Sequence, residues 1–140
     1  MTTETKPEAV LDTNVLVSAA LSDGKPYEVL SLAEDRRIIS VTSEPILTEL
    51  SDVLRRDRLP FTDKQVADLT AKIISISSVV DPEISLEVID DDPDDDKILE
   101  AAVAGDVEYI VSGDSHLLDL DTHAGIAIHD PAEFLAKIQL

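Results

Sequence analysis

The chain has 140 residues, which suits one domain with one hydrophobic core, and its apolar content of 44% is ordinary for a globular protein. It contains no cysteine, which excludes a disulfide scaffold and a cysteine-based zinc site and suits a cytoplasmic protein. Thirty acidic residues against eleven basic ones give a formal charge of −19, which repels polyanions at long range and taken alone argues against a nucleic-acid partner.

The first eight residues are polar and lack the apolar core of a signal peptide, so we predict a disordered tail over residues 1–8 and a single domain over residues 9–140. No apolar run approaches the roughly 18 residues that cross a bilayer, and no membrane association is expected. Hydrophobic patterning predicts alternating strands and helices in the first half of the domain. In chain order these are a strand at 9–11, a helix from Asp12 to residue 20, a helix from Pro26 to Arg37, a strand at 38–41, and a helix that Ser43 caps and that ends at Leu54.

The second half continues the alternation. In chain order it contains a helix from its cap Thr62 to Ile76, a short strand at 79–80, a helix at 93–104, strands at 107–111 and 126–128, and a helix from Pro131 to Ile138. Continuous apolar strands separated by helices predict an α/β fold of three layers, with a central parallel sheet covered by helices on both faces. In such folds the site lies beyond the carboxyl ends of the strands, and this rule selects the acidic residues that matter.

Two aspartates follow predicted strands directly. Asp12 comes after the strand at 9–11, and Asp114 comes after the strand at 107–111 and a tight turn. If both strands are parallel, both carboxylates lie at the same edge of the sheet. The alternative is that these residues are helix or turn caps, a role that Asn14 also suits.

Glu49 belongs to the predicted helix that ends at Leu54. It lies about 100° from the centre of the apolar stripe of this helix, closer to the stripe than the helix's other acidic residues. We therefore expect Glu49 to be the acidic residue of this helix that is best placed to reach inward. The alternative is a glutamate at the rim of the helix with its carboxylate in water.

An acidic run occupies residues 90–96, where six of the seven positions are aspartate. Part of it suits a solvated loop that caps the next helix, with Asp92 at the N-cap before a proline. One turn further, Asp95 and Asp96 flank the buried side of the helix, which carries Leu99. One of the two is therefore expected to reach the same sheet edge. Converging carboxylates repel one another unless a cation joins them or one binds a proton, and Mg²⁺ and similar hard cations prefer such oxygen ligands.

At these residues the sequence resembles PIN-domain proteins and, more narrowly, their VapC-like toxin group. The resemblance covers residues 9 to about 135, and four short motifs carry it in the order typical of the family. The matching stretches are Val10–Ser18, Ser43–Leu54 around Glu49, Asp92–Ala102 and Tyr109–Leu118, with Pro131–Leu135 similar to the C-terminal end of the group.

The resemblance implies a PIN-like fold with a parallel sheet of four or five strands, and an endoribonuclease whose acidic cluster binds Mg²⁺ or Mn²⁺. Asp12, Glu49 and Asp114 match three acidic positions of the family. The fourth falls on Asp95 or Asp96, because the Asp-rich run leaves the register open, and Asp96 is the first choice. On this interpretation Asp12, Glu49, Asp96 and Asp114 are catalytic, and Asp95 is a further candidate ligand.

Other residues are predicted to support this site. Thr13 and Ser112 match positions at which a hydroxyl often supports the acidic cluster, and Asn14 is a further supporting candidate. Lys97 lies beside the predicted site and is a candidate for contacting the scissile phosphate. His116 stands where many PIN sequences have a further acidic residue, which argues against a fifth carboxylate.

The resemblance also implies partners: RNA as the substrate, a second copy in a homodimer, and an antitoxin protein that silences the enzyme. Other PIN proteins are housekeeping nucleases or inactive. Two alternatives are open, namely a PIN-fold interaction protein without catalysis and a two-metal phosphoesterase with a substrate other than RNA. The negative charge has three explanations: a bound metal, a basic partner, or a salt-rich cytoplasm, in which the Debye length falls to about 3 Å at 1 M salt. We favour the last, a halophilic source, because the acidic residues are spread along the chain.

Overall fold

The structure is a computed structural model that describes residues 6–56, 58–82 and 93–138, with the backbone alone described at 93–95. Strands and helices alternate along most of it. In chain order they are β1 (Glu8–Leu11), α1 (Thr13–Leu21), α2 (Lys25–Glu34), β2 (Ile39–Ser43), α3 (Glu44–Leu54), α4 (Asp63–Ile76), β3 (Ser77–Val80), α5 (Pro93–Gly105), β4 (Tyr109–Val111), α6 (Ser115–Leu120), β5 (Thr122–His123), β6 (Ile126–His129) and α7 (Pro131–Ile138).

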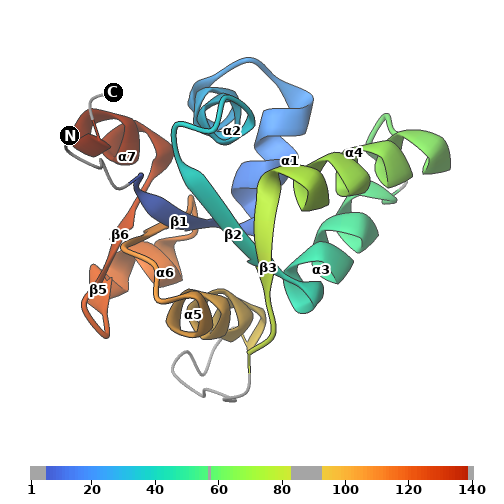
Figure 1. Ribbon diagram of the computed structural model, residues 1–140. Helices are drawn as coiled ribbons and strands as arrows, with labels where there is room; N and C mark the ends of the chain where they lie inside the picture. The colour runs from blue at the N-terminus through green and yellow to red at the C-terminus, as the bar shows by residue number, and fades with distance from the viewer. Residues whose placement is uncertain (1–5, 57, 83–92, 139–140) are drawn as a thin grey trace.

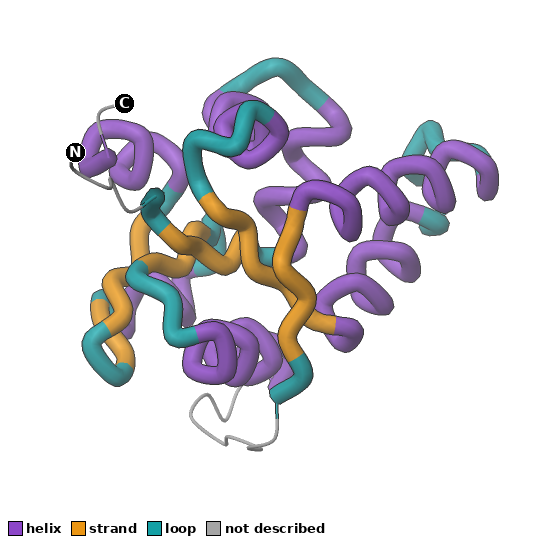
Figure 2. Tube along the Cα trace, in the orientation of Figure 1, coloured by secondary structure: helices purple, strands orange, loops and turns teal. Residues whose placement is uncertain are grey.

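The strands form one sheet in the order β3-β2-β1-β4-β6-β5. Neighbouring strands are parallel except for the pair β5–β6, and the central strand β1 pairs through Val10 with Val41 on one side and Ile110 on the other. Helices α5 and α6 lie on one side of the sheet, while α1, α2 and α7 lie on the other (Figure 1). The tube in Figure 2 shows the same layers, with the strands running between the two groups of helices. The predicted three-layer α/β fold is therefore confirmed with a mostly parallel sheet. Among the described residues, five of its strands are parallel, within the four or five expected, and β5 adds a sixth, antiparallel strand.

Two short elements were not predicted from the sequence: the helix α6 and the strand β5. Strand β5 has two residues and pairs antiparallel with β6 through a two-residue turn, Ala124 and Gly125. Both turn residues have positive φ, 51° and 80°, which is the geometry that a tight hairpin requires. A strand of two residues is too short to show the alternation on which sequence prediction depends.

The core consists, among the described residues, of buried Ala, Val, Leu and Ile side chains and one aromatic ring, that of Phe134. Tyr109 at the start of β4 meets this ring edge-on, with 5.4 Å between the ring centres. The strands β1, β2 and β4 bury nearly all their side chains, as parallel strands between two helical layers do. None of the described helices is long and apolar enough to span a membrane.

The predicted helix caps Ser43 and Thr62 are both present. The Ser43 hydroxyl accepts a hydrogen bond from the backbone N–H of Ile46 at the start of α3. Thr62 and Gln65 form a reciprocal capping box at the start of α4. The cap expected at Asp92 lies outside the described residues, as do residues 1–5 of the predicted tail.

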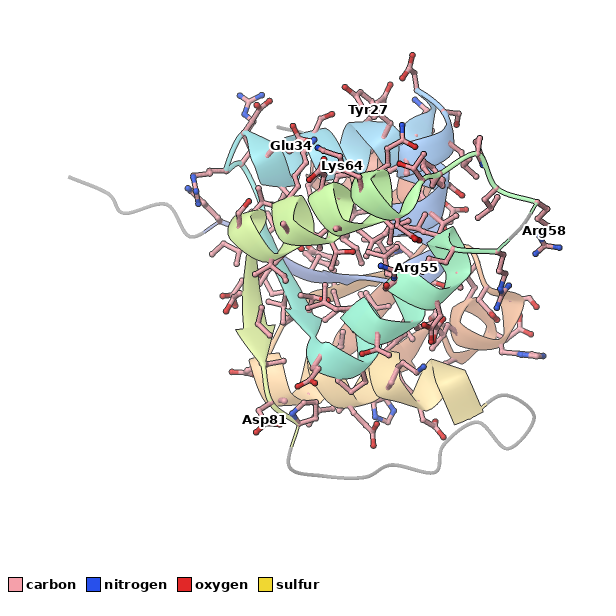
Figure 3. All side chains as sticks on the ribbon, turned by 90° about the vertical axis from the view of Figure 1, so that its right-hand side faces the viewer. Tyr27, Glu34, Arg55, Arg58, Lys64 and Asp81 are labelled. Carbon is pink, nitrogen blue, oxygen red and sulfur yellow. The ribbon has the colours of Figure 1, made fainter. Side chains whose placement is uncertain are left out.

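The outer surface formed by α3 and α4 carries charged side chains that point into solvent (Figure 3). The ion pair between Lys72 on α4 and Glu34 on α2, with 2.7 Å between Nζ and Oε1, lies on this side of the molecule. Both partners are substantially exposed, so salt screens the pair and its contribution to stability is small.

Candidate active site

Asp12 and Asp114 lie at the same edge of the sheet, where the neighbouring strands β1 and β4 end. The backbone N–H of Asp12 donates to the carbonyl oxygen of Val111 over 2.9 Å, which continues the pairing of the two strands. Ser112, which follows β4, donates its hydroxyl proton to Oδ2 of Asp12 over 2.7 Å. The same hydroxyl oxygen accepts from the backbone N–H of Asp114 over 2.9 Å. One buried hydroxyl therefore ties the two aspartate-bearing chain segments together.

Asp12 is a buried carboxyl group whose side chain does not cap a helix. It occupies the N-cap position of α1, yet it makes no side-chain capping hydrogen bond, and only 4% of its surface is exposed. Burial raises the pKa of Asp12 from its ordinary value of 3.8 to about 6, against the opposing effect of the Ser112 hydrogen bond. The carboxylates of Glu49 and Asp114 raise the pKa of Asp12 further by repulsion. The structure thus brings Asp12, Glu49 and Asp114 within electrostatic reach of one another.

Asp114 does act as a cap. Its Oδ1 accepts from the backbone N–H of His116 over 2.8 Å at the start of α6, and the His116 ring nitrogen Nδ1 lies 3.7 Å from the same oxygen. The capping explanation therefore holds for Asp114. The cap uses only Oδ1 of this half-buried carboxylate. Oδ2 can still bind a metal, so Asp114 can be both a cap and a ligand.

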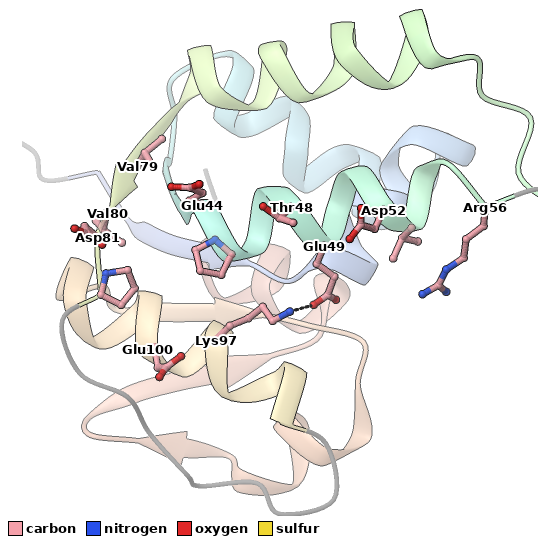
Figure 4. Close-up of a pocket in the computed structure, with 13 residues that line it drawn as sticks. Glu44, Thr48, Glu49, Asp52, Arg56, Val79, Val80, Asp81, Lys97 and Glu100 are labelled. Carbon is pink, nitrogen blue, oxygen red and sulfur yellow. Dashed lines mark hydrogen bonds and ion pairs between the residues drawn. The ribbon is translucent and has the colours of Figure 1, made fainter.

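Glu49 reaches the site from α3 and is paired with Lys97 on α5. The distance between Lys97 Nζ and Glu49 Oε2 is 2.5 Å, and the two side chains are 19% and 26% exposed (Figure 4). The inward placement expected for Glu49 is what the structure shows. Lys97, the candidate for contacting the scissile phosphate, contacts this carboxylate in the structure. The packing of α3 against α5 brings the two residues together, and local sequence patterns do not predict such a contact.

Asp96, the first choice for the fourth acidic residue, is buried in the first part of α5 with 7% of its surface exposed. A buried aspartate of this kind is unusual outside a charge network or a metal site. The side chain of Asp95, the alternative, lies outside the described residues.

The predicted supporting residues stand around Asp12. Thr13 is buried, and its Oγ1 makes no hydrogen bond with any residue in the described part of the chain. Asn14 accepts from the backbone N–H of Gly113 over 3.1 Å, which fastens the turn before Asp114 to the start of α1. The hydroxyl of Ser112 is fully buried between the two aspartates.

The residues fit a hard divalent cation in their chemistry, since the donors are carboxylate and hydroxyl oxygens. Burial and the neighbouring carboxylates raise the pKa of Asp12, and a bound cation would stabilise its charged form. The buried hydroxyl of Thr13, which makes no hydrogen bond with the described residues, is a further oxygen donor that a cation could use. Within the described ranges, no three His, Asp or Glu side chains already stand in ligand geometry. Binding by the described side chains alone therefore requires their rotation, and Glu49 in particular must turn from Lys97 or share its carboxylate.

A groove of about 1030 Å³ adjoins the site between α3, α5 and the end of β3, and sequence patterns did not reveal it. It shares Glu49 and Lys97 with the site but not Asp12, Asp96 or Asp114. Most of its other charged lining residues are acidic, as Figure 4 shows. They are Glu44, Asp52, Asp81 and Glu100, with Arg56 as the additional basic residue.

The fold and the acidic sheet edge define an α/β domain of the kind that carries its site beyond the carboxyl ends of parallel strands. The chain belongs to the PIN domain family, whose sequence pattern it matches over residues 8–116. Its fold is similar to that in the crystal structure of VapBC2 from Rickettsia felis bound to a DNA fragment from their promoter. The TM-score is 0.61 at 16% sequence identity, and the match covers 88% of this chain and 98% of that chain. No curated protein sequence gives a significant match.

Proposed function

We propose that this PIN domain is a metal-dependent endoribonuclease that hydrolyses RNA phosphodiester bonds at the edge of the sheet where Asp12 lies. The observation that carries the proposal is the buried Asp12, whose pKa is raised to about 6 by burial and by the carboxylates of Glu49 and Asp114. A buried acidic group with a strongly shifted pKa, beside other carboxylates at the edge of a parallel sheet, is typical of a functional site. PIN domains are typically nucleases that bind Mg²⁺ or Mn²⁺, which makes a nuclease the function best supported here.

The residues that would hold Mg²⁺ or Mn²⁺ are Asp12, Glu49, Asp96 and Asp114, with Asp95 as a further candidate. When bound, such ions activate a water molecule and stabilise the leaving oxygen of a phosphodiester. Neighbouring residues position two members of this set, Asp12 and Asp114.

Ser112 has the clearest role in holding the carboxylates. It fixes Oδ2 of Asp12 and the backbone of Asp114 through its hydroxyl, while Asn14 fixes the turn between them. The buried hydroxyl of Thr13 is available as an additional oxygen donor. This arrangement presets the positions of Asp12 and Asp114 before any ligand binds.

We further propose that the protein is a VapC-like toxin that works in the cytoplasm, forms a homodimer and is silenced by an antitoxin. The fold shared with VapBC2 supports this assignment. The charge of −19 supports a partner too, because a basic antitoxin segment would neutralise part of it. Co-expression with the product of a neighbouring small gene, followed by purification of a complex, tests this part of the proposal.

The experiment for the nuclease itself is an RNA cleavage assay with purified protein and Mn²⁺. Internal cuts that stop in EDTA and in the Asp114→Asn variant are the expected result. Cleavage that continues undiminished in EDTA would contradict the metal mechanism and would indicate a contaminating metal-free ribonuclease.

Two other functions belong to the same fold. The pairing of Glu49 with Lys97 favours an interaction protein without catalysis, because the lysine ammonium group occupies the position of a metal on this candidate ligand. Such a protein would show no Mn²⁺ binding at millimolar concentration. A two-metal phosphoesterase would instead hydrolyse a small phosphate ester such as p-nitrophenyl phosphate and leave RNA intact.

A further inference from the structure

The ion pair between Lys97 and Glu49 differs in its burial from the other ion pairs in the described part of the chain. Like the Lys72–Glu34 pair it joins two helices, here α3 and α5, and its partners are 48 residues apart in sequence. With side chains 19% and 26% exposed, it is the most buried pair among those in the described residues. The Lys72–Glu34 pair, for comparison, has side chains 47% and 33% exposed. Partial burial reduces screening by water and salt, so the Lys97 charge acts strongly on its surroundings.

The surroundings of Lys97 are a cluster of negative charges. Its ammonium group touches the Glu49 carboxylate, and Glu49 is itself close enough to Asp12 to raise the pKa of Asp12. Asp96 precedes Lys97 directly on α5 and is buried. The Lys97 charge thus contacts a carboxylate that is itself within electrostatic reach of Asp12.

We propose that Lys97 is a positioning residue that holds the Glu49 carboxylate in the metal-free protein and competes with the divalent cation for it. The inference rests on the proposed metal site and adds a regulatory element to it. An ammonium group on Oε2 of Glu49 and a divalent cation on the same carboxylate repel each other, so metal binding works against the ion pair. Lys97 therefore lowers the affinity for the metal while it keeps the acidic site assembled in its absence.

The structure offers Lys97 a place to go when a cation takes Glu49. Lys97 also lines the groove of about 1030 Å³, whose walls carry the carboxylates of Glu44, Asp81 and Glu100. A lysine side chain has four rotatable methylene groups and can swing its ammonium group into such a groove without loss of backbone structure. In that position the ammonium group would lie among the acidic groups that line the groove.

Calorimetry with Mn²⁺ and no RNA tests the competition directly. Lys97→Met keeps the length and apolar stem of the side chain but removes its charge, and we expect Mn²⁺ to bind roughly tenfold more tightly than to the wild type, equivalent to about 1.4 kcal/mol. Lys97→Arg keeps the charge and is expected to bind Mn²⁺ like the wild type. Lys72→Met removes an equal charge from the exposed pair with Glu34 and controls for the change in net charge.

A double-mutant cycle with Glu49→Gln separates competition at Glu49 from a general electrostatic effect. If Lys97 acts through Glu49, adding Lys97→Met to Glu49→Gln changes the Mn²⁺ affinity much less than Lys97→Met does alone. Circular dichroism melting of each variant shows that it is folded, and Lys97→Gln replaces Lys97→Met if the latter does not fold. Unchanged or weaker Mn²⁺ binding in a folded Lys97→Met protein would overturn the inference.

The proposed metal site and the role of Lys97 can be tested separately. If Asp12→Asn binds Mn²⁺ as well as the wild type does, the proposed metal site is wrong, whatever Lys97 does. If Asp12→Asn abolishes binding while Lys97→Met leaves it unchanged, the metal site stands and only the role of Lys97 is wrong.

Discussion

Ser112 donates its hydroxyl proton to Oδ2 of Asp12 over 2.7 Å and thereby joins the ends of the neighbouring strands β1 and β4. The same hydroxyl accepts the backbone N–H of Asp114, so one side chain controls the spacing between two candidate ligands. Ser112 would act on a bound metal only through Asp12 and Asp114. We therefore expect it to affect the geometry of these two ligands and the pKa of Asp12 more than the binding of RNA.

Ser112→Ala should weaken both the fold and the site. The buried Asp12 loses a hydrogen bond to its charged form, which costs about 1–3 kcal/mol of unfolding free energy. Loss of the bond that lowers the pKa of Asp12 also moves that pKa upward from about 6. RNA cleavage should fall by roughly tenfold to a hundredfold, as when a group that orients a metal ligand is removed.

Urea unfolding and a cleavage pH profile measure these two effects. Ser75→Ala, at an exposed serine of α4 remote from the site, is the matched control. Wild-type stability and an unchanged pH profile in Ser112→Ala would contradict the role given to this hydroxyl.

Asp12→Asn should make the metal-free protein more stable at pH 8. The pKa of Asp12 is about 6 in the folded state and near 3.8 in the unfolded state, so the unfolded state loses its proton first as the pH rises. Folding stability therefore falls between pH 3.8 and about 6 and stays reduced above that range, by up to about 3 kcal/mol. Asparagine has no charge to bury and avoids this loss.

Thermal melting in EDTA at pH 4 and at pH 8 measures the difference. The variant should gain stability over the wild type at pH 8 and show little difference at pH 4. An equal effect at both values would mean that the ionisation of Asp12 is not the cause.

Divalent metal should stabilise the wild type and not Asp12→Asn. A ligand that binds only the folded state adds about 2.7 kcal/mol at a concentration of 100 times its Kd. At a constant ionic strength set with KCl, melting temperatures with increasing Mn²⁺ should rise for the wild type and stay level for the variant. A parallel rise in both proteins would place the metal elsewhere.

High ionic strength should favour both folding and RNA binding. With a charge of −19 on 140 residues, the acidic groups repel one another and repel RNA at low salt. The melting temperature and the RNA cleavage rate, measured from about 0.05 M to 2 M KCl, should both increase as salt first rises. Basic RNA-binding proteins show the opposite dependence of RNA binding on salt. Divalent metal should replace part of the salt. If the melting temperature and the cleavage rate both fall steadily with salt, a basic partner would be the better explanation of the negative charge.

The sequence predicted the layers of the fold because buried parallel strands leave a strong signal of short apolar runs. The strand at 9–11 and the strand that ends at Val111 were both placed correctly, and the edge shared by Asp12 and Asp114 follows from that placement. The short elements α6 and β5 were not predicted, since each is shorter than the pattern needed to recognise it.

The pair formed by Lys97 and Glu49 depends on how α3 and α5 pack against each other. That packing is a long-range property, and a pattern within either helix does not contain it. The supporting hydroxyl of Ser112, by contrast, was predicted, because Ser112 matches a family position that often carries one. The structure adds that this hydroxyl is buried and bonds to both aspartate-bearing segments.

We propose above all that an acidic site containing Asp12 cuts RNA with the help of a divalent metal. Its most direct test is the single-turnover cleavage of a structured RNA by wild-type protein and by Asp12→Asn, purified in parallel, with Mn²⁺ and with EDTA. We expect internal cleavage by the wild type with Mn²⁺, none in EDTA, and a rate at least about a hundredfold lower in the folded variant. Equal cleavage by the two proteins, or cleavage that EDTA leaves intact, would contradict the account.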